Sequence, residues 1–168
     1  MDTKELIKKY ISAISEKYET KEATEHTYRF ALESLLQAMI SSRKNDSCIS
    51  IINEPKRREF GAPDFELRQG LMMISFIETK DIGDTDLRGT KASMNKRQFD
   101  KYKAAISTIA FTNFLDFVLY ENGKEILSAT IGHLDDEGIK MTSDEKQLSA
   151  FVTLVEKLAH AKPQPITS

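Results

Sequence analysis

The strongest constraint on the fold is an apolar run at residues 71–79. It follows a turn signal, Gln69-Gly70, and ends at charged side chains. Residues 64–68 alternate in polarity, as a strand does, and Gln69-Gly70 after them favours a tight turn. Residues 71–79 are nearly all apolar, which is typical of a buried central strand. Because so short a turn joins the two segments, the pattern predicts an antiparallel hairpin at the centre of the domain.

The rest of the chain predicts an α/β domain with a mixed central sheet. Hydrophobic periodicity indicates further helices and strands. The helices are expected at 4–18, 25–41 with Thr24 as N-cap, 96–109 and 144–161, and the further strands at 48–53, 114–120 and 125–132. The order ααβββαββα is that of one layered domain. We expect this domain to span residues 1–162, and residues 163–168, which contain two prolines, to form a linker-like tail.

Composition and length exclude several classes of protein. No apolar stretch approaches the roughly 20 residues that span a bilayer, and the polar N-terminus has no signal-peptide core. We therefore expect a cytoplasmic protein without a membrane partner. The single cysteine, Cys48, excludes an internal disulfide and a cysteine zinc site within one chain. The three histidines lie far apart in sequence, without metal-ligand spacing.

The net charge of −2 does not indicate a nucleic-acid binder, but the charge is unevenly spread. Residues 43–58 hold five basic and two acidic side chains, and residues 88–103 hold six basic and one acidic. A nearly neutral average can therefore conceal a basic face. Ordinary solvated helices and loops are the simpler interpretation of the same counts.

The hairpin places three charged residues where chemistry can occur. Side chains alternate along a strand, so Glu78 and Lys80 share a face, and Asp64 is expected opposite Glu78. Two adjacent carboxylates repel unless a cation intervenes, and Mg²⁺ binds one or two carboxylates together with water and phosphate oxygens. Lys80 would then orient or help deprotonate a water, or stabilise charge on a phosphate. Alternatively, Glu78 and Lys80 only end the strand and pair with surface charges.

These residues resemble the signature of the PD-(D/E)XK nuclease superfamily, Pro63-Asp64 followed by Glu78-x-Lys80. The surrounding segments resemble the N-terminal endonuclease domain of large fused restriction–modification polypeptides that also contain an adenine methyltransferase. The resemblance extends from about Thr24 to Leu134. It is carried by the segments Asn53-Glu54-Pro55, Gly61-Ala62-Pro63-Asp64-Phe65, Phe76-Ile77-Glu78-Thr79-Lys80-Asp81-Ile82-Gly83 and Gln98-Phe99-x-x-Tyr102.

The resemblance implies a restriction-endonuclease-like αβββαβ core and a metal-dependent endodeoxyribonuclease. Asp64 and Glu78 would be ligands to Mg²⁺, for which Mn²⁺ can substitute, with the Thr79 carbonyl as a further oxygen and Lys80 as the catalytic lysine. Many members add a glutamate from the helix that precedes the sheet. Glu25 lies on the apolar stripe of the predicted helix and Glu33 at its edge, so we favour Glu25 as a catalytic residue. A first-turn acid that is favoured by the helix dipole is the alternative.

DNA-binding residues are expected on both sides of the signature. Gln98 and Tyr102 share a helix face and resemble an element that steadies the site or touches the DNA backbone. The alternative is a core tyrosine beside a solvated glutamine. Basic side chains flank the predicted site and would hold phosphates: Lys56, Arg57, Arg58, Lys96 and Arg97.

The resulting hypothesis is a Mg²⁺-dependent DNA endonuclease domain of a restriction–modification or phage-defence system. Its partner would be DNA, bound by a homodimer if both strands are to be cut, with linked methyltransferase and target-recognition domains as further partners. The sequence contains no S-adenosylmethionine-binding signature and no obvious base-reading element. Two alternatives stay open: a non-cleaving DNA-binding or assembly domain with the same fold, and a repair or junction-resolving nuclease of the same superfamily.

Overall fold

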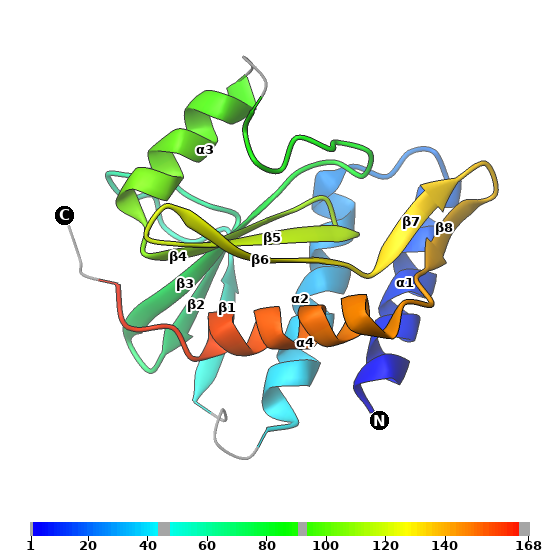
Figure 1. Ribbon diagram of the computed structural model, residues 1–168, viewed down its shortest axis with the longest axis horizontal. Coiled ribbons are helices and arrows are strands. Elements are labelled where there is room, and N and C mark those ends of the chain that lie inside the picture. The colour runs from blue at the N-terminus through cyan, green and yellow to red at the C-terminus, as the bar shows by residue number, and fades with distance from the viewer. Residues whose placement is uncertain (1, 44–47, 91–93, 165–168) are drawn as a thin grey trace.

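The computed structural model describes residues 2–43, 48–90 and 94–164 (Figure 1). Two helices open the chain, α1 (Thr3–Glu19) and α2 (Glu25–Ser41). The Asp2 carboxylate accepts the Glu5 backbone N–H and so caps α1, and a reciprocal pair of Thr24 and Thr27 begins α2. The sequence predicted α2 with the same bounds, because its cap and its apolar stripe are both strong local signals.

A six-stranded mixed sheet forms the centre of the domain, in the spatial order β1-β2-β3-β4-β5-β6. Its strands are β1 (Ile49–Asn53), β2 (Phe65–Gln69), β3 (Met72–Thr79), β4 (Thr108–Thr112), β5 (Asp116–Glu121) and β6 (Lys124–Thr130). Neighbouring strands are antiparallel except β3 and β4, which are parallel. Parallel neighbours need a crossover connection, and α3 (Met94–Ala105) provides it. The predicted α/β class with a restriction-endonuclease-like αβββαβ core, from α2 to β4, is confirmed.

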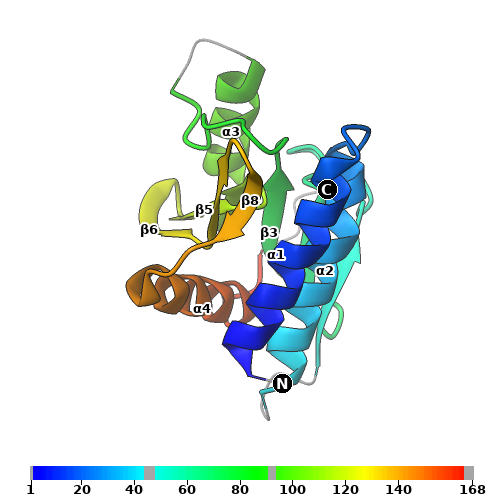
Figure 2. The ribbon, with the colours of Figure 1, turned by 90° about the vertical axis from the view of Figure 1, so that its right-hand side faces the viewer.

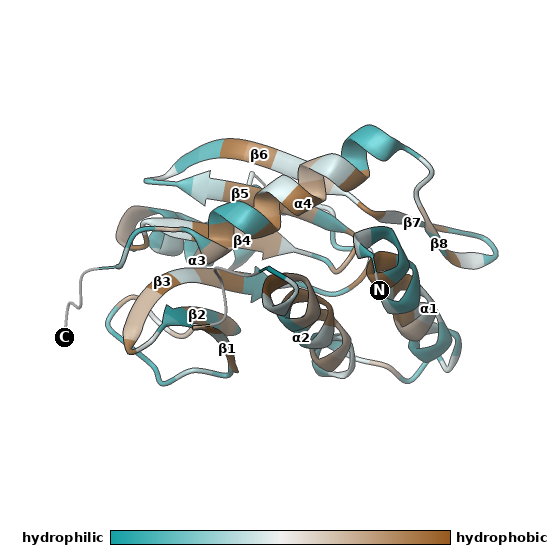
Figure 3. Ribbon diagram, turned by 90° about the horizontal axis from the view of Figure 1, so that it is seen from below, coloured by the Kyte–Doolittle hydropathy of each residue, from teal (hydrophilic) through white to brown (hydrophobic). Residues whose placement is uncertain are grey.

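Helices cover both faces of this sheet (Figure 2). Residues of α1, α2 and α4 (Glu145–Ala159) pack in one apolar cluster with Phe65, Leu67 and Ile77. A second cluster joins α3 to the opposite face, through Phe99 and Phe111. Hydrophobic and hydrophilic segments alternate along α1 and α4 in Figure 3, as expected for helices with one buried side. The β2–β3 hairpin is therefore enclosed between two helical layers.

The structure corrects two predicted element boundaries. The helix predicted over 96–109 ends at Ala105, and Thr108–Thr112 is the fully buried strand β4. Ile106 and Ile109 have a spacing that fits a helix, but β-branched residues around them fit a strand, and pairing with β3 decides between the two. The next strand begins at Asp116, not Phe114, because Phe114 lies in a turn with φ of 77°.

Two further features were absent from the prediction. A small hairpin of β7 (Gly132–Asp135) and β8 (Gly138–Met141) packs beside α1, and its strands are too short and polar for a periodic signal. Gln164, in the predicted tail, donates its backbone N–H to the Met73 carbonyl, and its side chain accepts the Ser107 N–H. Within the described ranges, no helix combines the length and apolar character that crossing a bilayer requires.

Candidate active site

The β2–β3 hairpin brings Asp64, Glu78 and Lys80 together. Phe65 pairs with Ile77, so Asp64 comes to lie beside Glu78, and its backbone N–H donates to Glu78 Oε1 at 3.3 Å. Lys80 follows β3, and its Nζ lies 3.7 Å from Glu78 Oε2. The strand pairing that the sequence predicted is confirmed, and it places the three signature side chains at one end of β3.

Asp64 is held by two protein partners. Its Oδ2 accepts the Thr79 backbone N–H and lies 2.7 Å from the Thr79 hydroxyl, while Arg29 Nη2 lies 2.7 Å from Oδ1. A carboxylate offers about four lone-pair sites, and these contacts use at most three of them. The Asp64 carboxylate is therefore fixed in orientation and still has acceptor capacity.

Glu25 reaches this cluster from the first turn of α2. Its Oε1 accepts a hydrogen bond from Arg29 Nη2 at 2.7 Å and lies 2.9 Å from the Thr79 hydroxyl. Glu25 thus contacts Asp64 only through these shared neighbours, and Glu33 forms none of these contacts. Arg29 was not predicted as a site residue. Its position four residues after Glu25, next to Tyr28 on the predicted apolar stripe, could have indicated an ion pair within the helix.

Glu78 has the most perturbed titration in the site. Burial and the negative charge of Asp64 raise the pKa of Glu78 to about 9, and the positive charge of Lys80 opposes that rise only in part. Only 4% of the residue is exposed. A buried carboxyl group beside a second carboxylate is a position where an added cation would stabilise the ionised form.

The first turns of α3 support Lys80. The Lys80 ammonium donates to Gln98 Oε1 at 2.8 Å and lies 5.4 Å from the centre of the Phe99 ring. Tyr102 is buried, and burial with the nearby charge of Glu78 raises the pKa of its hydroxyl to about 12. The ring packs so closely on Gly61 that a Cβ there would lie 3.1 Å from it. Gln98 therefore steadies the lysine, and the placement of Tyr102 favours a packing role.

The predicted basic residues fall into two groups. Lys56 and Arg57, in the loop before β2, and Arg97 on α3 are exposed. Arg58 and Lys96 are engaged elsewhere: Arg58 pairs with the fully buried Glu66, and Lys96 forms an ion pair with Asp100. Lys56, Arg57 and Arg97 could meet a phosphate directly, whereas Arg58 and Lys96 would first have to leave these partners.

The residues present fit a magnesium or manganese ion. Among the described residues, no group of three or more histidine, cysteine or acidic side chains has a metal-holding arrangement. Asp64 and Glu78 supply two carboxylates, and Mg²⁺ is commonly held by one or two carboxylates, with water completing its shell. The buried, mutually repelling pair has the hard oxygen donors that such an ion requires.

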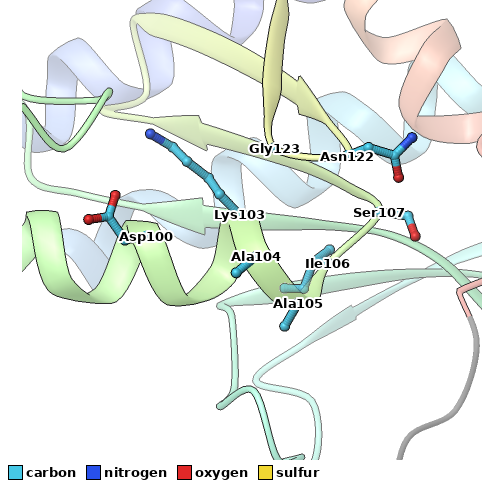
Figure 4. Close-up of a pocket in the computed structure, with 8 residues that line it drawn as sticks. All are labelled: Asp100, Lys103, Ala104, Ala105, Ile106, Ser107, Asn122 and Gly123. Carbon is cyan, nitrogen blue, oxygen red and sulfur yellow. The ribbon is translucent and has the colours of Figure 1, made fainter.

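A separate pocket of about 580 Å³ lies at the opposite end of β4 from the carboxylate cluster (Figure 4). It is lined by Asp100, Lys103, Ala104, Ala105, Ile106, Ser107, Asn122 and Gly123. Ser107 precedes β4, whereas the far end of β4, at Thr112, pairs with Thr79. The pocket is therefore separated from the carboxylate cluster by the length of β4.

The comparisons with known proteins add a structural likeness. Neither a scan against protein-family models nor a search of curated proteins finds a match. Among solved structures, a chain of the DrdV–DNA complex determined by cryo-electron microscopy superposes with a TM-score of 0.67. It is 21% identical in sequence, and the match covers 95% of this chain and 99% of that chain. At this identity the likeness establishes the fold that the two chains share.

Proposed function

We propose that this chain is a Mg²⁺-dependent DNA endonuclease domain, with Asp64, Glu78 and Lys80 as its catalytic residues. The observation that carries the proposal is the meeting of these three side chains at the end of β3, in the order that the PD-(D/E)XK resemblance implies. The shared fold with a chain of a DNA complex supports DNA as the partner. A restriction–modification or phage-defence role, and a homodimer on DNA, belong to the same proposal.

The chemistry follows from the charges around Glu78. Asp64 and Glu78, with the Thr79 carbonyl, would hold the ion, which when bound would polarise a phosphate oxygen and favour deprotonation of a water. Lys80, anchored on Gln98, has its ammonium 3.7 Å from Glu78 and can orient the water or stabilise negative charge on the phosphate. Gln98 thus acts by placing the lysine, and exposed Lys56, Arg57 and Arg97 would hold the DNA backbone.

The test is cleavage of supercoiled plasmid with Mg²⁺ or Mn²⁺. Wild type is compared with Asp64→Asn and Lys80→Met, and with two matched controls on exposed residues of other elements, Asp136→Asn and Lys146→Met. We expect cleavage by wild type and both controls, and none by the two site variants. Cleavage that survives both site substitutions would falsify the assignment. Branched and linear duplexes, compared in the same assay, separate a repair nuclease from a restriction enzyme.

A second function, a non-cleaving DNA-binding domain, is favoured by one observation. Both oxygens of Asp64 already have protein partners, Arg29 on one and Thr79 on the other. An Asp64 carboxylate that is neutralised by Arg29 alone would fix the loop before β2 without any ion. DNA binding that is unchanged by chelators and by Asp64→Asn, with no cleavage, would support this function over the first.

A further inference from the structure

Arg29 occupies the space between Glu25 and Asp64. Its Nη2 lies 2.7 Å from an oxygen of each carboxylate, Glu25 Oε1 and Asp64 Oδ1. Only 9% of the Arg29 side chain is exposed. A buried guanidinium that contacts two carboxylates through one nitrogen provides the positive charge that this pair requires.

The remaining nitrogens of Arg29 are also held. Nε donates to the Thr79 hydroxyl at 3.2 Å, and Nη1 lies 3.2 Å from His26 Nδ1 and 3.6 Å from Glu54 Oε1. All three guanidinium nitrogens therefore have partners. The group is fixed between α2 and the hairpin, and does not project into solvent as a surface arginine does.

The Thr79 hydroxyl cannot replace this cation. It lies 2.9 Å from Glu25 Oε1 and 2.7 Å from Asp64 Oδ2, but a hydroxyl has one proton to donate. It can therefore satisfy only one of the two carboxylates at a time. Without Arg29, Glu25 and Asp64 would share a hydroxyl and have no positive charge between them, which is a setting that attracts a divalent ion.

We propose that Arg29 is a positioning residue that serves as the resident cation of the Glu25–Asp64 half of the site. The chain then binds a single divalent ion, between Asp64 and Glu78, and Glu25 acts by holding Arg29 instead of binding metal. This inference rests on the proposed function, since it assumes that an ion binds at Asp64 and Glu78. It assigns Glu25 a different role from the catalytic one that the sequence analysis expected.

The test counts the Mn²⁺ ions bound per chain, by calorimetry and by the electron paramagnetic resonance of free Mn²⁺, without DNA. Wild type is expected to bind one ion. Arg29→Met, which removes the charge and keeps a side chain of similar length, is expected to bind two. Arg29→Lys, the double variant Arg29→Met with Glu25→Gln, and the control Arg43→Met are each expected to bind one. Arg43 pairs with Glu156, outside the site.

Each outcome bears on the proposal. Two ions in wild type, or one ion in a folded Arg29→Met variant, would overturn it. If Arg29→Met does not fold, wild type and Glu25→Gln decide: one ion in both supports the proposal, and two ions that fall to one in Glu25→Gln contradict it. No ion bound by wild type would defeat the proposed function and this inference together, whereas two ions would defeat this inference alone.

Discussion

Two acid–arginine clusters lie side by side on the hairpin and have opposite charge balance. The cluster at the end of β3 has four carboxyl groups and two cations: Glu25, Glu54, Asp64 and Glu78 with Arg29 and Lys80. The cluster within β2 has one carboxylate, Glu66, between Arg58 and Arg68. The first retains an excess of negative charge, whereas the second does not.

This difference separates a structural cluster from the proposed functional one. Glu66 is fully buried, and within the described part of the chain the Arg58 Nε is a buried side-chain nitrogen without a hydrogen-bond partner. Positive charge in excess around a buried carboxylate leaves no reason for a cation to bind. Glu78, by contrast, is buried beside another carboxylate with one ammonium group at 3.7 Å. The same residue type is therefore saturated with positive charge in one cluster, whereas in the other it belongs to the proposed ion site.

The largest expected effect is that of Glu78→Gln on cleavage. This substitution removes one carboxylate of the proposed ion site, so plasmid cleavage should fall by about 10²–10⁴-fold, the range typical for loss of one catalytic group. The same substitution at Glu66 should leave cleavage per folded molecule unchanged. Equal loss of cleavage in the two variants would remove the distinction between the clusters.

Glu66→Gln should instead have the larger effect on stability. It leaves Arg58 and Arg68 without their carboxylate, and removing one partner of a buried ion pair costs about 3–5 kcal/mol. Urea denaturation of the metal-free chain measures this loss of stability. The midpoint urea concentration should fall, while the slope of the free energy of unfolding against urea concentration stays unchanged. A midpoint equal to that of wild type would mean that the Glu66 cluster contributes nothing to the fold.

A further effect on stability is its pH dependence. The folded-state pKa of Glu78 is raised to about 9 from its ordinary value of 4.5, so between these values the folded chain holds a proton that the unfolded chain has lost. The free energy of unfolding should therefore fall as pH rises through this window, by at most about 1.4 kcal/mol per pH unit.

Unfolding of the metal-free chain at pH 5, 7 and 9 measures this slope. The slope should be absent in Glu78→Gln and present in the control Asp136→Asn. A slope that persists in Glu78→Gln would place the responsible group elsewhere in the molecule.

The smallest effect is expected outside both clusters. Arg57 is exposed, unlike Arg58 in the same loop, so Arg57→Ala should weaken DNA binding uniformly across sequences and reduce the slope of log affinity against log salt by about 1. Fluorescence anisotropy with Ca²⁺ in place of Mg²⁺ measures binding without cleavage. A slope that is unchanged by Arg57→Ala would remove this loop from the DNA interface.

Local signals explain why much of the fold could be predicted. The apolar stripe of α2, its threonine cap and the Gln69-Gly70 turn are each encoded within a few residues. The turn brings Asp64 close to the end of β3, and a register shift between Leu67 and Arg68 then places it beside Glu78. β4 could not be predicted in the same way. Whether this segment forms a strand or a helix depends on its pairing with β3, about thirty residues earlier in the chain, because local spacing alone also fits a helix.

The composition of the candidate site was only partly accessible for the same reason. Side-chain alternation brings Glu78 and Lys80 to one face, but Arg29 joins them only because α2 packs on a face of the sheet and so brings Arg29 to Thr79. Its role depends on contacts to Asp64 and Thr79, which lie on other elements. The Glu66 cluster is also formed by side chains whose burial depends on tertiary packing.

The proposed mechanism depends on Asp64 and Glu78 binding the divalent ion together. Anomalous diffraction from crystals that contain Mn²⁺ locates the ion independently of activity. We expect one peak, with an oxygen of each carboxylate about 2.0–2.3 Å away. No peak at these residues, or a peak only at the acidic β7–β8 turn, would contradict it.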